Sequence, residues 1–371
     1  MAKPVGEVPP FLPYACPVTP ADLSRTVLRA VRRAVDEDVL RAPVPERVRV
    51  ERTRPGGSGD YACAVALQLA GPAALPAREV AALLRDRVAG APGIGGVEIT
   101  GAGFLNFTLD AASDGAARSA RVRQALEQGL RYGWGAECAG QVHQLHHRHE
   151  VRAAVVAGVV GKLLRAQGAL VRTTCEEVPD PAWARLGVTV DAHGRPPVPL
   201  ARIRPVPAGA TAGELLGRLG ADAARWGLLR PAGHDRAAPG DELLVQGEGN
   251  PLFLVRYAHA RARALARGGA LLGLTGAYEQ DVDAPVLHAA IADHPGVLAA
   301  AARHRAPDRL ARHLETVAHT FFDFHDTCPP LPVGDEKPSA AHRSRLALAE
   351  AAGTVLAGGL SLLGISAPEH L

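Results

Sequence analysis

The sequence has little of what would mark a secreted, membrane-bound or strongly charged protein. Its five cysteines, Cys16, Cys63, Cys138, Cys175 and Cys328, are scattered and form no CxxC pair, which excludes a disulfide framework and fits a reducing cytosol. The net charge is only +3, so composition alone does not require a polyanionic partner. No uninterrupted apolar run is long enough to span a membrane, and no basic segment followed by an apolar core opens the chain. We therefore expect a cytoplasmic protein that does not bind membranes.

The sequence does have the length and hydrophobic content of a folded, multidomain protein, with 371 residues of which 47% are hydrophobic. The first 130 residues predict an α+β unit. Thr19-Pro20 is typical of a helix start, with an N-cap and then proline at the first helical position, and a helix over 20–36 should follow. Beyond it we expect a strand near Val48 and Val50, helices over 61–70 and 77–88, and two strands around a glycine turn within 97–109.

The segment 131–205 is the least regular part of the chain. It contains HQLHHRHE (His143 to Glu150), a clear helix from Glu150 to Gln167, and a proline-rich tract over 195–207. A zinc site needs three or four convergent ligands, and the spacing of these histidines does not supply them. We therefore favour solvated histidines at a helix entry over a metal site, and expect no metal. Acid–base catalysis by a histidine paired with Glu150 is a weaker alternative.

The remaining segment, 206–371, predicts helices almost throughout. Asn250-Pro251 is again an N-cap followed by proline, opening LFLVRYAHARARALA. On that helix we expect a packed face with Phe253 and Tyr257 and a basic face with Arg256, Arg263 and Arg267. A buried stripe should follow at Leu310, Leu314, Val317, Phe321 and Phe324, and a last helix over 343–363 should stop at Gly364.

Three segments, in this order, resemble arginyl-tRNA synthetases. GDYACAVALQLA, AREVAALL and VEITGAGFLNFTL resemble the N-terminal additional domain of that family, although Ala64 replaces its usual asparagine. The residues from Asp191 to Pro199 and LLGRLGADAARWGLL resemble the approach to its stem domain. NPLFLVRYAHARARAL, FFDFHDTCPPL and the last 27 residues resemble its helical anticodon-binding (DALR) domain. The resemblance implies three parts: an N-terminal additional domain (1–130), a reduced remnant of the class I α/β catalytic domain (131–205), and a stem with an all-α anticodon-binding bundle (206–371).

The same resemblance predicts that ATP chemistry is lost. About 75 residues stand where the family has a catalytic domain of several hundred, too few for a doubly wound sheet. The family's HIGH signature is degraded to His146-His147-Arg148-His149, with Glu150 where the second histidine belongs. Its lysine loop is replaced by Leu200-Ala201-Arg202, which has no lysine. We therefore expect a pseudoenzyme with no catalytic residues and no cofactor.

The retained end domains imply that the chain binds tRNA, with arginine tRNA as the first candidate. The residues expected to contact RNA are Asn106, Phe107, Asn250, Arg256, Tyr257, His259, Arg261, Arg263, Phe324 and His325. Arginines would meet phosphates, and flat rings would stack on unpaired bases. Two alternatives stay open: an interaction scaffold without RNA that pairs with a protein through the shortened centre, and a residual ATP-dependent arginine–tRNA ligase.

Overall fold

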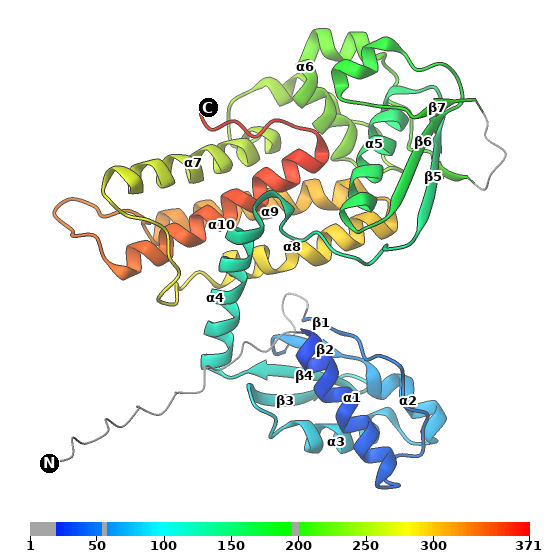
Figure 1. Cartoon of the computed structure of the whole chain (residues 1–371), viewed down its shortest axis with the longest axis vertical. Coiled ribbons are helices and arrows are strands. Elements are labelled where there is room, and N and C mark those ends of the chain that lie inside the picture. Colours follow the sequence, from blue (N-terminus) through cyan, green and yellow to red (C-terminus); the bar gives the residue numbers. More distant parts are fainter. Residues whose placement is uncertain (1–19, 54–57, 195–199) are drawn as a thin grey trace, which may run out of the picture. The chain divides into compact units, whose positions relative to one another are not determined.

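The computed structural model describes residues 20–53, 58–194 and 200–371. The expected N-cap at Thr19, the proline-rich lead-in and residues 195–199 of the proline-rich tract 195–207 lie outside these residues. The chain divides into two compact units, Met1–Ala120 and Arg121–Leu371 (Figure 1). The predicted middle and C-terminal segments share one hydrophobic core within the second unit.

The first unit is a four-stranded antiparallel sheet with helices packed on it. Its elements are α1 (Pro20–Asp36), β1 (Val50–Arg52), β2 (Tyr61–Cys63), α2 (Val65–Ala73), α3 (Ala77–Val88), β3 (Ile94–Thr100) and β4 (Phe104–Leu109), with strand order β1-β2-β4-β3. The predicted helix over 61–70 is wrong at its start, because Tyr61 pairs with Phe107 in the sheet and the helix begins only at Val65. Gly59, just before β2, has φ +74°, and a Cβ there would lie 2.8 Å from the Phe107 carbonyl oxygen.

The second unit joins a small parallel sheet to a helical bundle. Helix α4 (Ala111–Gln128) crosses the division between the units. Then follow η1 (Gly129–Arg131), β5 (Val142–His147), α5 (Val151–Ala166), β6 (Leu170–Cys175), η2 (Pro181–Leu186), β7 (Ala192–His193), β8 (Ala201–Ile203), α6 (Ala212–Leu229), η3 (Asp241–Leu244), α7 (Pro251–Leu271), α8 (Pro285–His304), α9 (Pro307–Thr327) and α10 (Ala340–Leu363).

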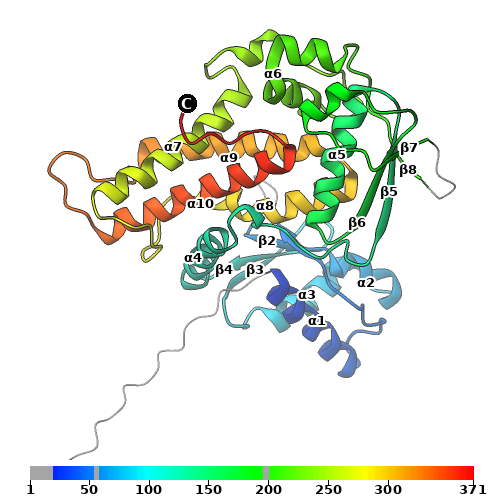
Figure 2. The same cartoon turned by 45° about the horizontal axis from the view of Figure 1, so that its top comes forward.

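The parallel sheet has strand order β7-β6-β5-β8 and lies beside α5 (Figure 2). Helix α5 connects β5 to β6, which is the crossover that parallel strands require. Leu145 and Cys175, on one face of the sheet, belong to the core together with α5. The other face carries the exposed Arg172 and Arg202 and, near the start of β5 and β6, the exposed Val142 and Leu170. The sheet is therefore packed on one face by α5 and carries both polar and apolar side chains on the other.

The bundle is formed by α7 to α10. The predicted stripe from Leu310 to Phe324 is confirmed, since each of its five side chains is at most 3% exposed. Helix α10 is long and apolar enough to cross a membrane, but 78% of its most apolar window is buried inside the protein, as in the core helix of a bundle. Its predicted stop is confirmed, because Gly364 ends the helix at φ +72°.

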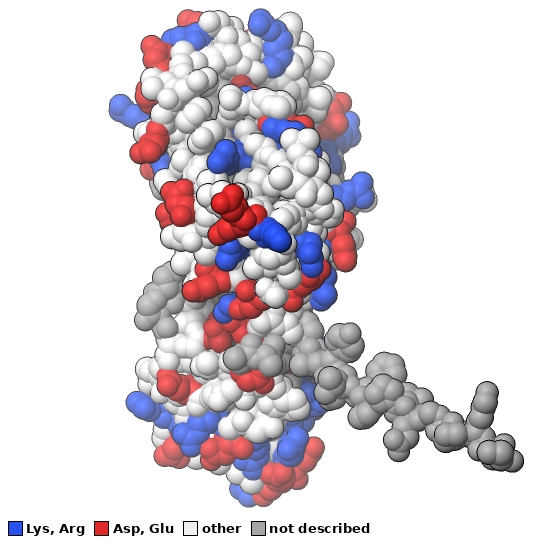
Figure 3. All heavy atoms as spheres, turned by 90° about the vertical axis from the view of Figure 1, so that its left-hand side faces the viewer, with Lys and Arg blue, Asp and Glu red and all other residues white. Residues whose placement is uncertain are grey.

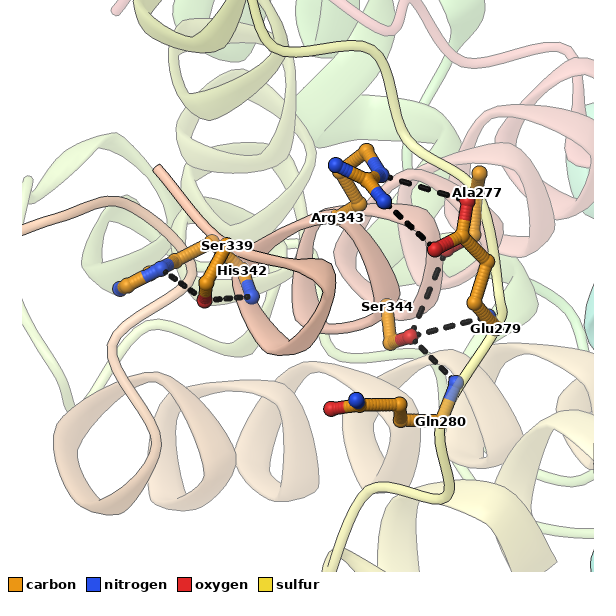
Figure 4. A network of polar contacts seen from close by, with 7 residues as sticks. All are labelled: Ala277, Glu279, Gln280, Ser339, His342, Arg343 and Ser344. Atoms are coloured by element: carbon orange, nitrogen blue, oxygen red, sulfur yellow. Dashed lines mark hydrogen bonds and ion pairs between the residues drawn. The ribbon is translucent and has the colours of Figure 1, made fainter. Parts of the chain in front are cut away.

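A polar network at the start of α10 fixes the loop between α7 and α8 (Figure 4). Ser339 caps the helix by accepting from the His342 amide. The Ser344 hydroxyl accepts from the amides of Glu279 and Gln280 at 3.0 and 2.9 Å. Arg343 pairs with Glu279 at 2.6 Å. The bundle end is thus ordered by hydrogen bonds that satisfy loop backbone groups.

Candidate nucleic-acid interface

The histidine segment runs along a strand and into a turn. His143, His146 and His147 belong to β5, and because a strand rises about 3.3 Å per residue, His143 and His147 are about 13 Å apart. His146 and His147 are only 6% and 1% exposed, which corrects the interpretation of solvated histidines. Arg148 and His149, in the turn, are exposed. Within the described ranges, no three histidine, cysteine or acidic side chains gather closely enough to hold a metal ion.

Each buried histidine makes a hydrogen bond through its Nδ1 atom. The Thr174 hydroxyl donates to the Leu145 carbonyl at 3.1 Å, so it accepts from His146 Nδ1, 2.9 Å away. His147 Nδ1 donates to the Arg148 carbonyl at 2.8 Å. Burial lowers the pKa of His147, which keeps the ring neutral. Both rings are therefore structural side chains at the end of β5.

An aromatic residue that sequence reasoning missed packs on the same turn. Trp183, on η2, is 3% exposed, and its ring centre lies 4.8 Å from that of His149 and 5.9 Å from that of His147. The signal in the sequence is a large aromatic side chain within the proline-containing segment 176–186. The rings of Trp183, His147 and His149 therefore pack together beside the turn.

Glu150 occupies the N-terminus of α5. Its Oε2 accepts from the Ala153 amide at 2.7 Å, and its Oε1 accepts from the Ala208 amide at 2.9 Å. A helix N-terminus binds phosphate through free amides and the positive end of the helix dipole. Here a carboxylate bonds one of those amides and brings negative charge of its own. The geometry is that of a capped helix, and it disfavours a triphosphate at this end.

Arg152, in the first turn of α5, forms hydrogen bonds to two further segments, one at Val206 and one over 228–235. The side chain is fully buried, and burial lowers its pKa. Its guanidinium donates to five backbone carbonyls, those of Val206, Leu228, Pro231, Ala232 and Asp235, at 2.6 to 3.0 Å. Sequence reasoning missed this role, although an arginine within the apolar run of α5 was the available signal.

The place of the expected second ATP signature is a strand. Leu200 precedes β8, and Ala201 and Arg202 belong to it. Arg202 aligns with His146 in the parallel pairing with β5. These residues therefore take part in backbone pairing at the edge of the sheet.

Helix α7 carries five of the ten residues expected to contact RNA, but its packed face differs from the predicted one. Val255, Ala258, Ala262 and Leu265 are buried at helical spacing. Tyr257, expected on the packed face, is 41% exposed. The buried side of α7 is therefore a different side of the helix from the one that carries Tyr257.

Tyr257 is the middle of three stacked rings. Its centroid lies 5.5 Å from that of Phe253, with 7° between the planes, and 5.4 Å from that of Phe322 on α9, with 23°. Such offset stacks are favourable in proteins, and exposed rings are platforms for unpaired bases. Sequence reasoning missed Phe322, because attention fell on the adjacent Phe321 in the predicted buried stripe of α9.

Arg261 and His325 extend this surface with polar groups. Arg261 is exposed, and its Nε donates to His325 Nε2 at 3.2 Å. His325 Nδ1 then donates to Asp326 Oδ1, also at 3.2 Å. The predicted pair is therefore brought together, with one positive charge facing solvent beside the aromatic stack.

Four other predicted side chains are mostly internal. Asn250 caps α7 by accepting from the amides of Leu252 and Phe253, and its Nδ2 donates to two carbonyls of the preceding loop. Phe324 and Phe107 are 3% and 0% exposed, so both rings are core side chains and their inclusion among RNA-contacting residues is corrected. His259 is 4% exposed and bonds the Pro368 carbonyl.

Three arginines of the expected basic face are engaged by the C-terminal residues. Arg263 pairs with Glu369 at 3.0 Å, Arg267 donates to the Glu369 carbonyl at 3.2 Å, and Arg256 donates to Ser366 at 3.3 Å. Figure 3 shows positive and negative side chains interspersed on the face it presents, rather than one basic field.

In the first unit, a cleft of about 420 Å³ opens on the face of the sheet that bears Ala62. It is lined by Arg49, Glu51, Thr53, Ala62, Ala64, Val65, Gln68 and Phe104. Phe104 is 40% exposed, whereas Asn106, on the same strand, is 4% exposed and donates to the Thr100 hydroxyl at 2.6 Å. Sequence reasoning named Asn106 and missed the accessible Phe104. Ala64, where the resembled family has asparagine, lies in this cleft.

Comparison with known proteins gives two family matches. Residues 22–109 match the arginyl tRNA synthetase N terminal domain, and residues 255–371 match the DALR anticodon binding domain. Arginine–tRNA ligases of Renibacterium salmoninarum and Frankia alni are 26% and 28% identical, in alignments that cover 95% of this chain and all of each relative. Each alignment extends over 553 positions, against 371 residues here, so at least 182 positions have no residue of this chain opposite them.

Solved structures agree on the fold. The arginyl-tRNA synthetase of Thermus thermophilus aligns with a TM-score of 0.67 at 14% identity, covering 95% of this chain and all of that one. That of Plasmodium falciparum aligns with a TM-score of 0.64 at 9% identity, covering 96% of this chain and all of that one. Fold and domain matches together define a protein of the aminoacyl-tRNA synthetase class. More particularly, the chain is arginyl-tRNA synthetase-like, with the N-terminal domain of that family and its C-terminal helical anticodon-binding domain.

Proposed function

We propose that this protein is a non-catalytic arginyl-tRNA synthetase-like protein that binds tRNA, or a tRNA-like RNA, through its two end domains. The observation that carries the loss of catalysis is Glu150, whose two carboxylate oxygens bond the Ala153 and Ala208 amides at the N-terminus of α5. An ATP phosphate at this point would meet a carboxylate in place of free amides.

The size of the centre supports the same proposal. The alignments with full ligases leave at least 182 positions without a residue of this chain, and the central sheet has four short strands among the described residues. We infer that most of the gap falls in the catalytic domain, because the two family matches lie toward the ends of the chain. The Leu200-Ala201-Arg202 strand also offers no lysine for a developing phosphate charge.

RNA binding is supported by the accessible groups of the anticodon-binding domain. The stack of Phe253, Tyr257 and Phe322 offers ring faces, and Arg261 with His325 offers charge and hydrogen bonds beside it. Unpaired RNA bases are bound by this combination of stacking and polar contacts. The cleft beside Phe104 provides a second surface of similar chemistry in the first unit. Arginine tRNA is the first ligand to test.

The centre does not favour the scaffold alternative. A protein-docking surface there should be a contiguous apolar patch. The outward face of the parallel sheet instead mixes the exposed Arg172 and Arg202 with the exposed Val142 and Leu170.

The proposal is tested by titrating the full chain with tRNA transcripts, including arginine tRNA, at several salt concentrations. Salt-sensitive binding that weakens in Tyr257→Ala supports it. Leu271→Ala is the matched control, because Leu271 is 89% exposed at the far end of the same helix. Absence of salt-sensitive binding to every transcript at micromolar protein would refute RNA binding. ATP–pyrophosphate exchange above background would refute the loss of catalysis.

A further inference from the structure

The residues after α10 turn back along α7. Figure 1 shows the C-terminal end of the trace close to this helix. Ile365 is buried in the common core, and the next residues contact α7 on one face. Their partners are Arg256, His259, Arg263 and Arg267, spaced by three or four residues along the helix.

The two segments match in length. From Arg256 to Arg267 the helix rises about 16 Å, at 1.5 Å per residue. Five extended residues, from Ser366 to His370, span roughly the same distance. Ser366 is also fixed at its start, because its amide donates to Asp222 on α6 at 3.1 Å. We call residues Ser366–Leu371 the tail.

The tail places acceptor oxygens where phosphates of a bound RNA would lie. Glu369 Oε1 accepts from Arg263 Nε and Nη2 at 3.2 and 3.0 Å, a two-nitrogen contact of the kind arginine makes with phosphate. The Glu369 carbonyl accepts from Arg267. The Pro368 carbonyl accepts from His259 Nδ1 at 2.9 Å, and burial lowers the pKa of His259, so this ring brings no charge.

These contacts are exchangeable. The side chains of Glu369 and Arg263 are 54% and 48% exposed, and an ion pair so open to water is weak and screened by salt. A phosphate carries at least as much charge as the carboxylate and offers more acceptor oxygens. The tail is anchored at Ser366 and held at Glu369 by bonds that a polyanion can replace.

We propose that the tail is an autoinhibitory strap on the basic face of α7, which RNA must displace to reach Arg263 and Arg267. The inference rests on the proposed RNA binding and adds its regulation. It divides the domain surface in two. The ring stack with Arg261 is open at all times, whereas the arginines under the tail become available only when Glu369 is released.

Two variants test the strap. Glu369→Gln removes the charge and keeps the shape, and deletion of 366–371 removes the tail while Ile365 stays in the core. Glu248→Gln removes one exposed acidic group elsewhere in the same unit and serves as control. We expect Glu369→Gln and the deletion to bind tRNA about 2- to 10-fold more tightly at low salt. The slope of log affinity against log salt should steepen by about 1.4, the value for two additional phosphate contacts on a single strand.

The outcomes separate the strap from RNA binding itself. If the wild type binds RNA and neither variant binds more tightly, or the deletion binds more weakly, the strap is overturned and the proposed function stands. If the wild type and all variants fail to bind, both are overturned. As a second measurement, hydrogen exchange at the amides of Ser366, Ala367, Glu369 and His370 should become faster when tRNA is added. Unchanged or slower exchange in a bound complex overturns the strap.

Discussion

Acid should weaken the second unit because two neutral histidines are buried side by side in its core. His294 on α8 and His313 on α9 are 1% and 9% exposed, and their ring centroids lie 5.3 Å apart. Tyr132 stacks on the other side of His294 at 5.9 Å. Within the described part of the chain, His294 Nδ1 and His313 Nε2 have no hydrogen-bond partner, so no acceptor favours the protonated rings.

The size of the effect follows from linkage. Burial lowers the pKa of His294 to about 3, with a further contribution from His313, and burial lowers that of His313 to about 4. In the unfolded chain both histidines should titrate near about 6.5. The unfolded state therefore binds more protons as the pH falls below that value, and stability falls with it. Between pH 7.5 and 5.0 each histidine should remove about 2 kcal/mol from the free energy of unfolding, or about 4 kcal/mol together.

The assay can follow this unit alone. The chain has three tryptophans, Trp134, Trp183 and Trp226, and all lie in the second unit. Urea unfolding followed by tryptophan fluorescence at pH 7.5 and 5.0 gives the two free energies. His294→Phe keeps a flat ring next to Tyr132 and removes one titrating group, so it should recover about 2 kcal/mol of the loss.

The matched control is His319→Gln, since His319 is an exposed histidine on the same helix as His313. It should show the full wild-type loss at pH 5.0. The reasoning is refuted if the wild type is equally stable at the two pH values, or if His294→Phe loses as much stability as the wild type.

Three further predictions concern α5 and α7. Arg152→Met should destabilise the second unit by about 3 kcal/mol or more in the same fluorescence assay, because five backbone carbonyls lose their donor; Arg172→Met, on the exposed face of β6, should cost little. Glu150→Ala should cost about 1–2 kcal/mol through the lost cap, while ATP–pyrophosphate exchange stays at background; a gain of exchange would contradict the assigned loss of catalysis. Tyr257→Leu should weaken tRNA binding by about 1–3 kcal/mol in a filter-binding titration, with unfolding unchanged; equal binding would remove the ring stack from the interface.

The sequence predicted elements that local rules specify. Proline after an N-cap located the start of α7, a regular apolar stripe gave the buried face of α9, and Gly364 marked the end of α10. The strand Tyr61–Cys63 was missed because a three-residue strand exists only through its pairing with β1 and β4. The face of Tyr257 was misplaced because the neighbours of α7, and not the size of its side chains, decide which face is buried.

The candidate site was harder to predict because the sequence shows charge but not its partners. Arginine fills at least three roles here. Arg152 and Arg225 are buried and donate to backbone carbonyls, with burial lowering the pKa of Arg225 to about 10. Arg263 and Arg267 are bound by the tail, whereas Arg261 faces solvent. A count of basic residues cannot separate these roles.

The division of the arginines into buried, tail-bound and solvent-facing groups limits how the protein can bind RNA under the proposed function. If the buried arginines are structural and those under the tail are engaged, the immediately available contacts of α7 are Arg261 and the ring stack. Stacking depends little on salt, whereas each phosphate contact adds to the salt slope. Initial binding should therefore depend on salt with a shallow slope set by Arg261, and the slope should steepen as Arg263 and Arg267 are released from Glu369. A full ligase must hold its tRNA for chemistry at a distant site, whereas under the proposed function this protein needs only to bind and release its RNA. An exchangeable tail on the basic helix is consistent with that simpler requirement.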